Sequence, residues 1–364
     1  MKKICFITPT SQQIIGFRKS LILKLQKEGH CISAITFDEE HREQVEDLDV
    51  ELHCVQAANR SINPFQTLSL KNSITKIIKQ VSPDIVFTFM VKPNTFGVLA
   101  AHEAGIENIY SMVEGAGDVF IKNGLKWKLI RKIVCYLYKK AFKYSKKVFF
   151  LNNDDKAEFI ERKLVKEEQC EIIHGVGIDF DRFQYKPILQ FNTFIMLSRL
   201  LKTKGVYEYC KAARKVKQKY TDTTFYLAGS EEDIKVKDLQ EYIDDNSIVY
   251  LGKLKDVIPF LEKSTVNVLP SYREGFGLVN AEAAAIGRPS ITCDTNGTRD
   301  TIIDEVTGFL VKVASVDAIV EKMIFFIENP EQAVIMGQNA RKFAEANFDI
   351  SLVNKKIIQI AIND

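Results

Sequence analysis

Short apolar runs alternate with longer amphipathic segments along nearly the whole chain, and this alternation limits the folds that it can adopt. In the first half the runs expected to form strands are 3–8, 31–37, 49–55, 84–90, 109–113 and 148–152. Apolar residues at helical spacing fill the segments between several of them, at 17–28, 68–81, 94–105 and 125–144. Strands that alternate with helices in this way are typical of a parallel, doubly wound sheet.

A second series of the same kind begins near residue 192. Its expected strands are 192–198, 224–228, 248–251, 266–269, 290–294 and 308–311, and its expected helices are 205–220, 257–263, 277–286, 316–328, 331–347 and 351–362. The connecting segment between the two series runs from 153 to 190. We therefore expect an α/β protein of two domains, at 1–180 and 181–350.

Composition agrees with a two-domain globular protein. The chain has 364 residues, which is long enough for two cores, and 46% of them are hydrophobic. Apolar runs stay shorter than the eighteen residues that a membrane-spanning helix needs, and the N-terminal run is too short for a signal peptide. Seven scattered cysteines favour reduced thiols and a cytoplasmic location. They and the five histidines show no metal-ligand spacing, so we expect no metal site.

The segment 266–290 combines an expected strand, a glycine-flanked loop and an expected helix. Unpartnered amides and the helix dipole favour an anion at such a helix N-terminus. Glu274 precedes the helix and Glu282 lies over one turn inside it, so their carboxylates could accept from ligand hydroxyls. The alternative is an ordinary strand–loop–helix with solvated glutamates, and the order of the elements favours a binding site.

Two cations follow the expected strand 192–198. Arg199 comes at once after it, and Lys204 directly precedes the glycine at which the next helix begins. In a parallel sheet the carboxyl ends of strands face the ligand, where a guanidinium and an ammonium can hold phosphate oxygens. Surface cations beside a loop are the alternative, and this alternative describes Lys202 well.

These motifs resemble the donor-binding signature of glycosyltransferase family 4, with its two glutamates separated by seven residues. The resemblance covers nearly the whole chain and implies the GT-B fold, two doubly wound Rossmann-like domains facing across a cleft. It also implies that a C-terminal helix, 351–364, joins the first domain. Family members are retaining enzymes that use nucleotide-sugars.

The resemblance also implies a role for each motif residue. Arg199 and Lys204 would hold the donor diphosphate, Glu282 the ribose and Glu274 the donor sugar. The other implied donor contacts are Gly275, Phe276, Gly277 and Leu278, and Leu254 in a segment that contacts the base. The leaving phosphate would itself help to deprotonate the acceptor, so that no covalent nucleophile, cofactor or metal is implied.

The first domain shows weaker signals. Gly16 is the sole glycine of the loop after the first strand, where family members often have a pair. Glu114 stands where many members have histidine, and the same Val-Glu-Gly pattern and an Asn-Thr-Phe-Gly stretch at 94–97 resemble a subset that extends lipid-linked sugars. Glu114 could bind a sugar hydroxyl, act on the acceptor hydroxyl or cap a helix. Lys92 could meet an acceptor phosphate.

Ten basic residues and no acidic ones lie between 121 and 150, although the net charge of the chain is only +3. A cationic amphipathic helix with aromatic residues suits an anionic membrane surface. The residues expected there are Lys126, Trp127, Lys128, Arg131, Lys132, Lys139, Lys140 and Lys143. A solvated helix that packs its apolar stripe on the sheet is the alternative, and no nucleic-acid motif accompanies the charge.

Together these features predict a retaining glycosyltransferase that is peripheral on the inner face of the plasma membrane. It would move a sugar, with N-acetylhexosamine as the expected one, from a UDP-sugar to an undecaprenyl-diphosphate-linked sugar in bacterial surface polysaccharide or glycan assembly. Two alternatives stay open. One is a GT-B enzyme with a soluble acceptor or a nucleotide-sugar 2-epimerase, and the other is a non-enzymatic membrane-associated partner of a polysaccharide complex.

Overall fold

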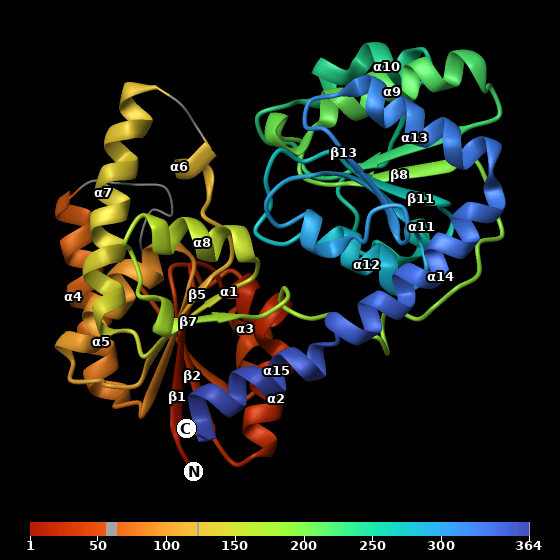
Figure 1. The fold of residues 1–364 in the computed structure, drawn as a ribbon. Coiled ribbons are helices and arrows are strands. Elements are labelled where there is room, and N and C mark those ends of the chain that lie inside the picture. Colours follow the sequence, from red (N-terminus) through yellow and green to blue (C-terminus); the bar gives the residue numbers. More distant parts are fainter. Residues whose placement is uncertain (56–63, 122–123, 364) are drawn as a thin grey trace. The chain divides into compact units, whose positions relative to one another are not determined.

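The computed structural model describes residues 1–55, 64–121 and 124–363. The chain divides into two compact units, which are residues 1–176 with 350–364, and residues 177–349. We call them unit 1 and unit 2, and each is described by itself (Figure 1). Lys122, one of the ten basic residues noted above, lies outside the described residues.

Unit 1 is built on a seven-stranded parallel sheet with the order β3-β2-β1-β4-β5-β6-β7. The strands are β1 Lys3–Ile7, β2 Cys31–Thr36, β3 Val50–Cys54, β4 Ile85–Phe89, β5 Ile109–Val113, β6 Lys147–Phe150 and β7 Cys170–Ile172. Strands β1, β4 and β5 are entirely or almost entirely buried, as expected for parallel strands covered on both faces. The direction in which successive strands are added reverses between β1 and β4. The segments that follow the carboxyl ends of these two strands are therefore neighbours.

The α-helices of unit 1 are α1 Ser11–Gln13, α2 Lys19–Lys27, α3 Arg42–Glu46, α4 Pro64–Val81, α5 Val98–Glu103, α6 Asp118–Ile121, α7 Leu125–Ala141, α8 Asn153–Glu161 and α15 Ile350–Ile358. Short 3₁₀ turns are η3 Phe142–Tyr144 and η4 Glu167–Gln169, and a π-helical turn, η8 Gln359–Asn363, follows α15. One hydrophobic cluster joins α4 and α5 to the central strands, and a second joins α7 and α8 to β6.

The last helix belongs to unit 1, where α15 lies beside α2 (Figure 1). The side-chain amide of Asn354 donates to the Ser20 hydroxyl at 2.9 Å, and the Lys356 ammonium donates to the Ile172 carbonyl at 2.7 Å. Val353, Ile357 and Ile358 are buried. Residues from the two ends of the sequence therefore share one core.

Two π-helical turns replace the regular starts of expected helices in unit 1. They are η1 Ile14–Arg18, which follows β1 and α1, and η2 Pro93–Gly97, which follows β4. Apolar spacing predicted ordinary helix over nearly all of η2, whereas η1 begins in the expected loop and extends into the helix predicted from residue 17. A pattern of buried residues does not distinguish an α turn from a wider π turn. Such turns are frequent at functional sites.

Unit 2 is built on a six-stranded parallel sheet with the order β10-β9-β8-β11-β12-β13. The strands are β8 Thr193–Leu197, β9 Thr224–Ala228, β10 Val249–Tyr250, β11 Val266–Leu269, β12 Ser290–Cys293 and β13 Gly308–Val311. The chain passes from β10 at one edge back to β11 at the centre. Because β8 and β11 are neighbours, the segments after their carboxyl ends lie next to each other.

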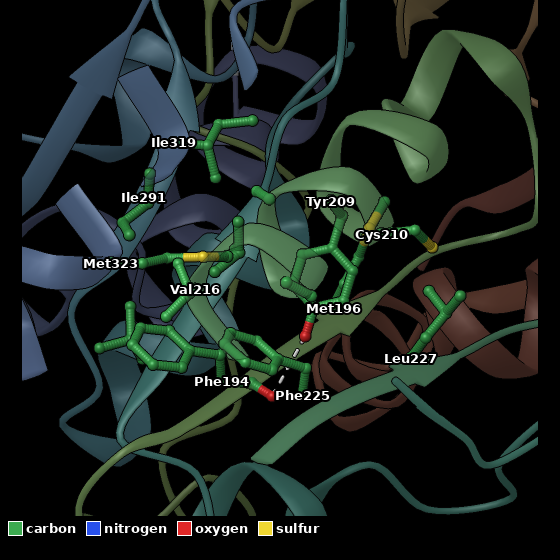
Figure 2. Close-up of a cluster of buried hydrophobic side chains, with 14 of the residues drawn as sticks. Phe194, Met196, Tyr209, Cys210, Val216, Phe225, Leu227, Ile291, Ile319 and Met323 are labelled. Carbon is green, nitrogen blue, oxygen red and sulfur yellow. Dashed lines mark hydrogen bonds between the residues drawn. The ribbon is translucent and has the colours of Figure 1, made fainter. Parts of the chain in front are cut away.

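The helices of unit 2 are α9 Val206–Lys219, α10 Gln240–Asp244, α11 Ile258–Glu262, α12 Leu278–Ile286, α13 Val316–Glu328 and α14 Pro330–Asn347, with 3₁₀ turns η5 Lys202–Lys204, η6 Val236–Leu239 and η7 Arg299–Thr301. Figure 2 shows the core between the sheet and the helices α9 and α13. Phe194 and Phe225 stack with ring centroids 5.2 Å apart, and the buried Tyr209 hydroxyl donates to the Phe194 carbonyl at 3.2 Å. The buried polar group is thereby satisfied.

Candidate functional site

Three loops meet at the carboxyl edge of the unit 2 sheet. They follow the neighbouring strands β8, β11 and β12, in which β11 is central. The β8 loop carries Arg199 and Lys204, and the β11 loop carries Glu274 and leads into α12. The sequence-predicted donor residues of these two loops are thus brought to one edge of one sheet.

Backbone hydrogen bonds tie the three loops together. The Tyr272 amide donates to the Thr203 carbonyl of the β8 loop at 2.9 Å. The Glu274 amide donates to the Asn296 carbonyl of the β12 loop at 3.0 Å, and the Thr295 hydroxyl donates to the Tyr272 carbonyl at 2.9 Å. The loop that carries Glu274 is therefore held from both sides before any ligand binds, which lowers the entropic cost of binding.

Two glycines allow this close approach. Gly205 and Gly297 both have φ of +75°. A Cβ atom at Gly205 would lie 2.3 Å from the Pro270 carbonyl oxygen, and one at Gly297 would lie 2.3 Å from the Glu274 carbonyl oxygen. Both positions combine a left-handed backbone with a contact that leaves no room for a side chain.

Lys204 and Glu274 form a close ion pair within this framework. The ammonium of Lys204 lies 2.5 and 2.6 Å from the two carboxylate oxygens of Glu274, and the two side chains are only 19% and 13% exposed. Arg199 differs, because its guanidinium is mostly exposed and lies 3.4 Å from the Glu232 carboxylate. The site therefore offers one fixed cation and one solvent-facing cation to an anionic ligand.

The amides at the start of α12 are less available than the sequence suggested. The Gly277 amide donates to the Gly297 carbonyl at 2.8 Å, and the Leu278 amide donates to the Phe276 carbonyl at 2.7 Å. Phe276 is itself buried and packs edge-on against Phe348, with centroids 5.2 Å apart. Two of the amides expected to hold a diphosphate thus donate to carbonyls of the neighbouring loops in this structure.

Glu282 lies at the middle of α12 and is partly buried. Desolvation raises its pKa from the ordinary value of 4.5 to about 7, and the charge of Arg182 opposes this shift. The carboxyl group is therefore partly protonated near neutral pH. A carboxyl in that state can both donate to and accept from a hydroxyl pair, whereas a carboxylate can only accept.

Leu254 lies apart from this group of residues. It is partly buried in the segment after β10, which is the edge strand and is separated from β8 by β9. The Gly252 carbonyl of the same segment accepts from the Gly229 amide at 2.9 Å, which ties this segment to the one after β9.

Sequence reasoning missed the residues that hold α12 in place. Arg288, just beyond the C-terminus of the helix, is completely buried and donates to the carbonyls of Leu261, Lys186 and Glu262 at 3.1, 2.6 and 2.7 Å. Asn280, inside the helix, accepts from Asn267 of β11 at 2.9 Å. Arg288 stands in a Gly-Arg-Pro turn that reads as an ordinary helix stop, so no local signal indicated its burial.

In unit 1, Glu114 is paired with a residue that the sequence did not single out. Its carboxylate accepts from the guanidinium of Arg18 in η1, and the two side chains are 9% and 3% exposed. The guanidinium also lies 4.0 Å above the ring of Phe89. Glu114 is therefore held by a cation on a neighbouring segment.

The other unit 1 candidates lie at neighbouring strand ends. Gly16 is exposed in η1 after β1, and Lys92 is partly buried after β4, where desolvation lowers its pKa. Asn94 is buried in η2, accepts from the Thr88 hydroxyl and donates to the Met112 carbonyl, both at 2.8 Å. Since β1, β4 and β5 are adjacent, the segments after these strands form one edge of unit 1.

Comparison with known proteins identifies the activity class. Residues 3–150 match the family model described as glycosyl transferase 4-like, and residues 177–343 match the model described as glycosyl transferases group 1. The two matches together cover most of both units. The chain belongs to the GT-B glycosyltransferases.

This glycosyltransferase has similar curated relatives along nearly its whole length. It is 27% identical over 98% of both chains to the N,N'-diacetylbacillosaminyl-diphospho-undecaprenol alpha-1,3-N-acetylgalactosaminyltransferase of Campylobacter jejuni. It is 26% identical to the UDP-Gal:alpha-D-GlcNAc-diphosphoundecaprenol alpha-1,3-galactosyltransferase of Escherichia coli, over 80% of this chain and 78% of the relative. The Anabaena protein Alr3699/HepE, solved in complex with UDP-glucose, has the same fold, with a TM-score of 0.81, 17% identity and 99% coverage of both chains.

The basic helix of the glycosyltransferase is α7, and it has three kinds of surface. Val134, Tyr138 and Ala141 are buried against unit 1. The predicted membrane residues that are exposed are Lys126, Lys128, Lys132, Lys139, Lys140 and, just beyond the helix, Lys143, whereas Trp127 and Arg131 are partly buried. The third surface is apolar and exposed, and it consists of Leu125, Leu129, Ile133 and Tyr136. We call these four residues the apolar stripe.

Among the described residues of the glycosyltransferase, no helix is long and apolar enough to cross a membrane. Within the same residues, no group of three or more His, Cys, Asp or Glu side chains is placed to hold a metal ion.

Proposed function

We propose that the protein is a retaining glycosyltransferase that moves N-acetylhexosamine from a UDP-sugar to an undecaprenyl-diphosphate-linked sugar, in bacterial surface polysaccharide or glycan assembly. The observation that carries the proposal is the pairing of Lys204 with Glu274 beside Arg199, at the ligand edge of the unit 2 sheet. The activities named for the Campylobacter and E. coli relatives support the lipid-linked acceptor, and that of the E. coli relative supports a UDP-sugar.

The donor would bind in unit 2 with its diphosphate on Lys204 and Arg199. Lys204 is already oriented by Glu274, so its charge is placed without reorganisation when negative charge grows on the leaving diphosphate. Glu274 would then share its carboxylate between Lys204 and the hydroxyls of the donor sugar. Glu282, on α12, would bind the two hydroxyls of the ribose.

In the retaining reaction the bond between the anomeric carbon and the phosphate oxygen breaks while the acceptor oxygen bonds to the same face of that carbon. The acceptor hydroxyl proton passes to the leaving phosphate oxygen. Cleavage of the bond develops negative charge on the diphosphate, and the arriving proton neutralises part of it. Fixed cations stabilise the developing charge most strongly in a site that is partly closed to water. No covalent bond to the protein is needed in this scheme.

Glu114 would contribute to the acceptor side of the reaction. Arg18 supplies it with a counter-charge, so the carboxylate keeps its orientation and still has lone pairs for a sugar hydroxyl. Lys92, after the neighbouring strand β4, would meet a phosphate of the acceptor. Glu114 and Lys92 both belong to unit 1.

The protein would act at the inner face of the plasma membrane, docked through α7. The apolar stripe supports this docking. A helix that packs only on its own domain typically presents polar residues to solvent, whereas α7 exposes four large apolar residues in one row. Exposed lysines flank the stripe on both sides. An apolar face between cations is the arrangement that binds an anionic membrane surface.

A transfer assay with a panel of UDP-, GDP- and ADP-sugars tests the proposal, with and without an undecaprenyl-diphosphate-linked sugar. We expect transfer from a UDP-N-acetylhexosamine only when the lipid-linked sugar is present, with the anomeric configuration of the donor kept in the product. Equal UDP release without lipid would favour a soluble acceptor or a 2-epimerase. Unchanged glycan production in cells that carry both Glu274→Gln and Arg199→Ala would favour a non-enzymatic partner.

A further inference from the structure

A cationic pocket lies on unit 1 between α7 and α8. Its volume is about 450 Å³, and its lining residues are Lys128, Arg131, Lys132, Cys135 and Arg162. Four of the five lining residues are cations. None of the roles assigned above to Arg199, Lys204, Glu274 or Glu114 uses it.

The two guanidinium groups of the pocket are fixed by the protein. The Arg131 Nε donates to the Val119 carbonyl at 2.8 Å, and the Arg162 guanidinium lies 5.3 Å from the ring centre of Phe120. Arg162 also pairs with Glu158 at 2.8 Å. Guanidinium groups that are fixed in this way favour the oxygens of a phosphate.

The pKa of Cys135 is also affected by the positive charges of the pocket. Burial raises the pKa of its thiol, while the charges of Arg162 and Arg131 act in the opposite direction. The sulfur is partly buried at the wall of the pocket, so a ligand that fills the pocket covers it.

The pocket runs along one flank of the apolar stripe. Lys128 is three residues after Leu125, and Lys132 is three residues after Leu129, so on the helix both lysines lie beside the stripe. With the stripe at the boundary of the acyl chains, these lysines would reach the level of the lipid headgroups.

We propose that the pocket between α7 and α8 binds the phosphate of an anionic glycerophospholipid headgroup and so fixes the orientation of unit 1 on the membrane. The inference rests on the membrane docking proposed above and names its partner. A lipid fits better than a free metabolite because the pocket opens beside the stripe, whose four residues are 51–85% exposed. A free phosphate has no acyl chains, so the apolar stripe beside the pocket would add nothing to its binding.

Binding to vesicles separates this pocket from general attraction to a charged surface. The full-length protein is sedimented with phosphatidylcholine vesicles that contain or lack about one third phosphatidylglycerol. The pocket variant is Lys128→Gln/Lys132→Gln, and the matched control is Lys126→Gln/Lys140→Gln, which removes the same charge from exposed lysines of the same helix. Near an anionic surface each removed cation alone weakens binding by about fivefold.

We expect the pocket variant to bind phosphatidylglycerol vesicles at least tenfold more weakly than the control variant. Equal losses for the two variants would overturn the pocket and leave membrane docking intact. A third variant, Leu129→Ser/Ile133→Ser, tests docking itself: if it binds as well as the wild type, or if the wild type binds no vesicle, the proposed docking fails and the pocket proposal fails with it.

Alkylation of Cys135 by N-ethylmaleimide gives a direct reading of occupancy, with the exposed Cys31 as the internal reference. Vesicles with phosphatidylglycerol should slow labelling of Cys135 at least threefold and leave Cys31 unchanged. Neither phosphatidylcholine vesicles nor inorganic phosphate should protect it. Equal protection by inorganic phosphate would overturn the assignment to a lipid headgroup, and labelling of Cys135 that no vesicle slows would overturn the pocket.

Discussion

The ammonium of Lys204 lies within 2.6 Å of both carboxylate oxygens of Glu274, although 70 residues separate them in the sequence. Each residue was predicted to contact the donor, and the structure adds that they contact each other. The pair places a cation where a diphosphate would bind and restrains the carboxylate that would bind the sugar. Its two side chains are both mostly buried, so the pair is little screened by solvent.

Replacing Lys204 with methionine should lower kcat about a hundredfold, because the variant loses a preorganised charge that is needed most in the transition state. Lys202→Met, at an exposed lysine of the same turn, is the control and should keep normal activity. Single-turnover transfer measured at saturating donor separates this effect from weaker donor binding. If the two variants lost activity equally, the general charge of the loop would explain the result and Lys204 would have no particular role.

Donor affinity should change with pH through Glu282, whose pKa is about 7. The ionised carboxylate accepts from both ribose hydroxyls, so the Kd for UDP should fall as the pH rises from 6 to 8, and Glu282→Gln should flatten this dependence. Isothermal titration with UDP checks it, and 2'-deoxy-UDP is the control ligand because it lacks one of the two hydroxyls. A dependence that persists in Glu282→Gln would assign the titration to another group.

The same pKa sets the sign of a stability effect. The folded protein keeps a proton on Glu282 that the unfolded chain releases above pH 4.5, so stability is lost as the pH rises from 4.5 to about 7. Glu282→Gln should therefore raise the free energy of unfolding above pH 7, by up to about 3 kcal/mol, and change it little at pH 4. Urea denaturation at both pH values tests the difference, and an equal change at the two would contradict it.

Removing one partner of the buried pair Arg18–Glu114 should cost about 3–5 kcal/mol of stability, since the other charge stays buried and unpaired. Arg18→Met and Glu114→Leu are the single variants, and the double variant should be less destabilised than the sum of the two. A double-mutant cycle in urea measures this coupling. Additive losses would show that the pair contributes no interaction energy of its own.

Alanine substitutions at three glycines should separate backbone strain from steric contact. Gly297 and Gly252 have nearly the same φ, +75° and +71°, but a Cβ at Gly252 would meet nothing within 4 Å. Gly252→Ala should cost only about 1 kcal/mol, whereas Gly297→Ala and Gly205→Ala should cost clearly more, because their Cβ atoms meet backbone at 2.3 Å. Thermal unfolding measures the loss of stability in all three variants. Equal losses would mean that the loops at Gly205 and Gly297 move to accept the added Cβ atom without strain.

The sequence predicted the strands well because each is a short buried apolar run with a polar or glycine stop. Four strands, at 109–113, 224–228, 266–269 and 308–311, begin and end at the predicted residues. The helix α3 Arg42–Glu46 was missed, since only Val45 in it is buried and it carries no apolar pattern. The π-helical turns were missed as well, because they use the same apolar residues as an α-helix would.

Contacts between residues far apart in the chain could not be predicted from the sequence. Arg18 and Glu114 are 96 residues apart, and nothing near either one indicates a charge partner. The meeting of Lys204 with Glu274 depends on β8 and β11 being neighbours, and that order is set by packing rather than by local pattern. The sequence could place both residues at strand ends, and the sheet order then decided which ends meet.

Because α15 belongs to unit 1, this unit cannot be completed until almost the whole chain has been synthesised. Residues 177–349, with all the strands of the second sheet, are synthesised after the first sheet and before the helix that covers α2. At ribosomal speeds of about 5–20 residues per second, this interval lasts roughly 9 to 35 seconds. During that time the surface of α2 that α15 later covers is exposed on the nascent first unit. A chain that stops before residue 350 keeps that surface exposed, because the covering helix is the last one of unit 1 to be synthesised.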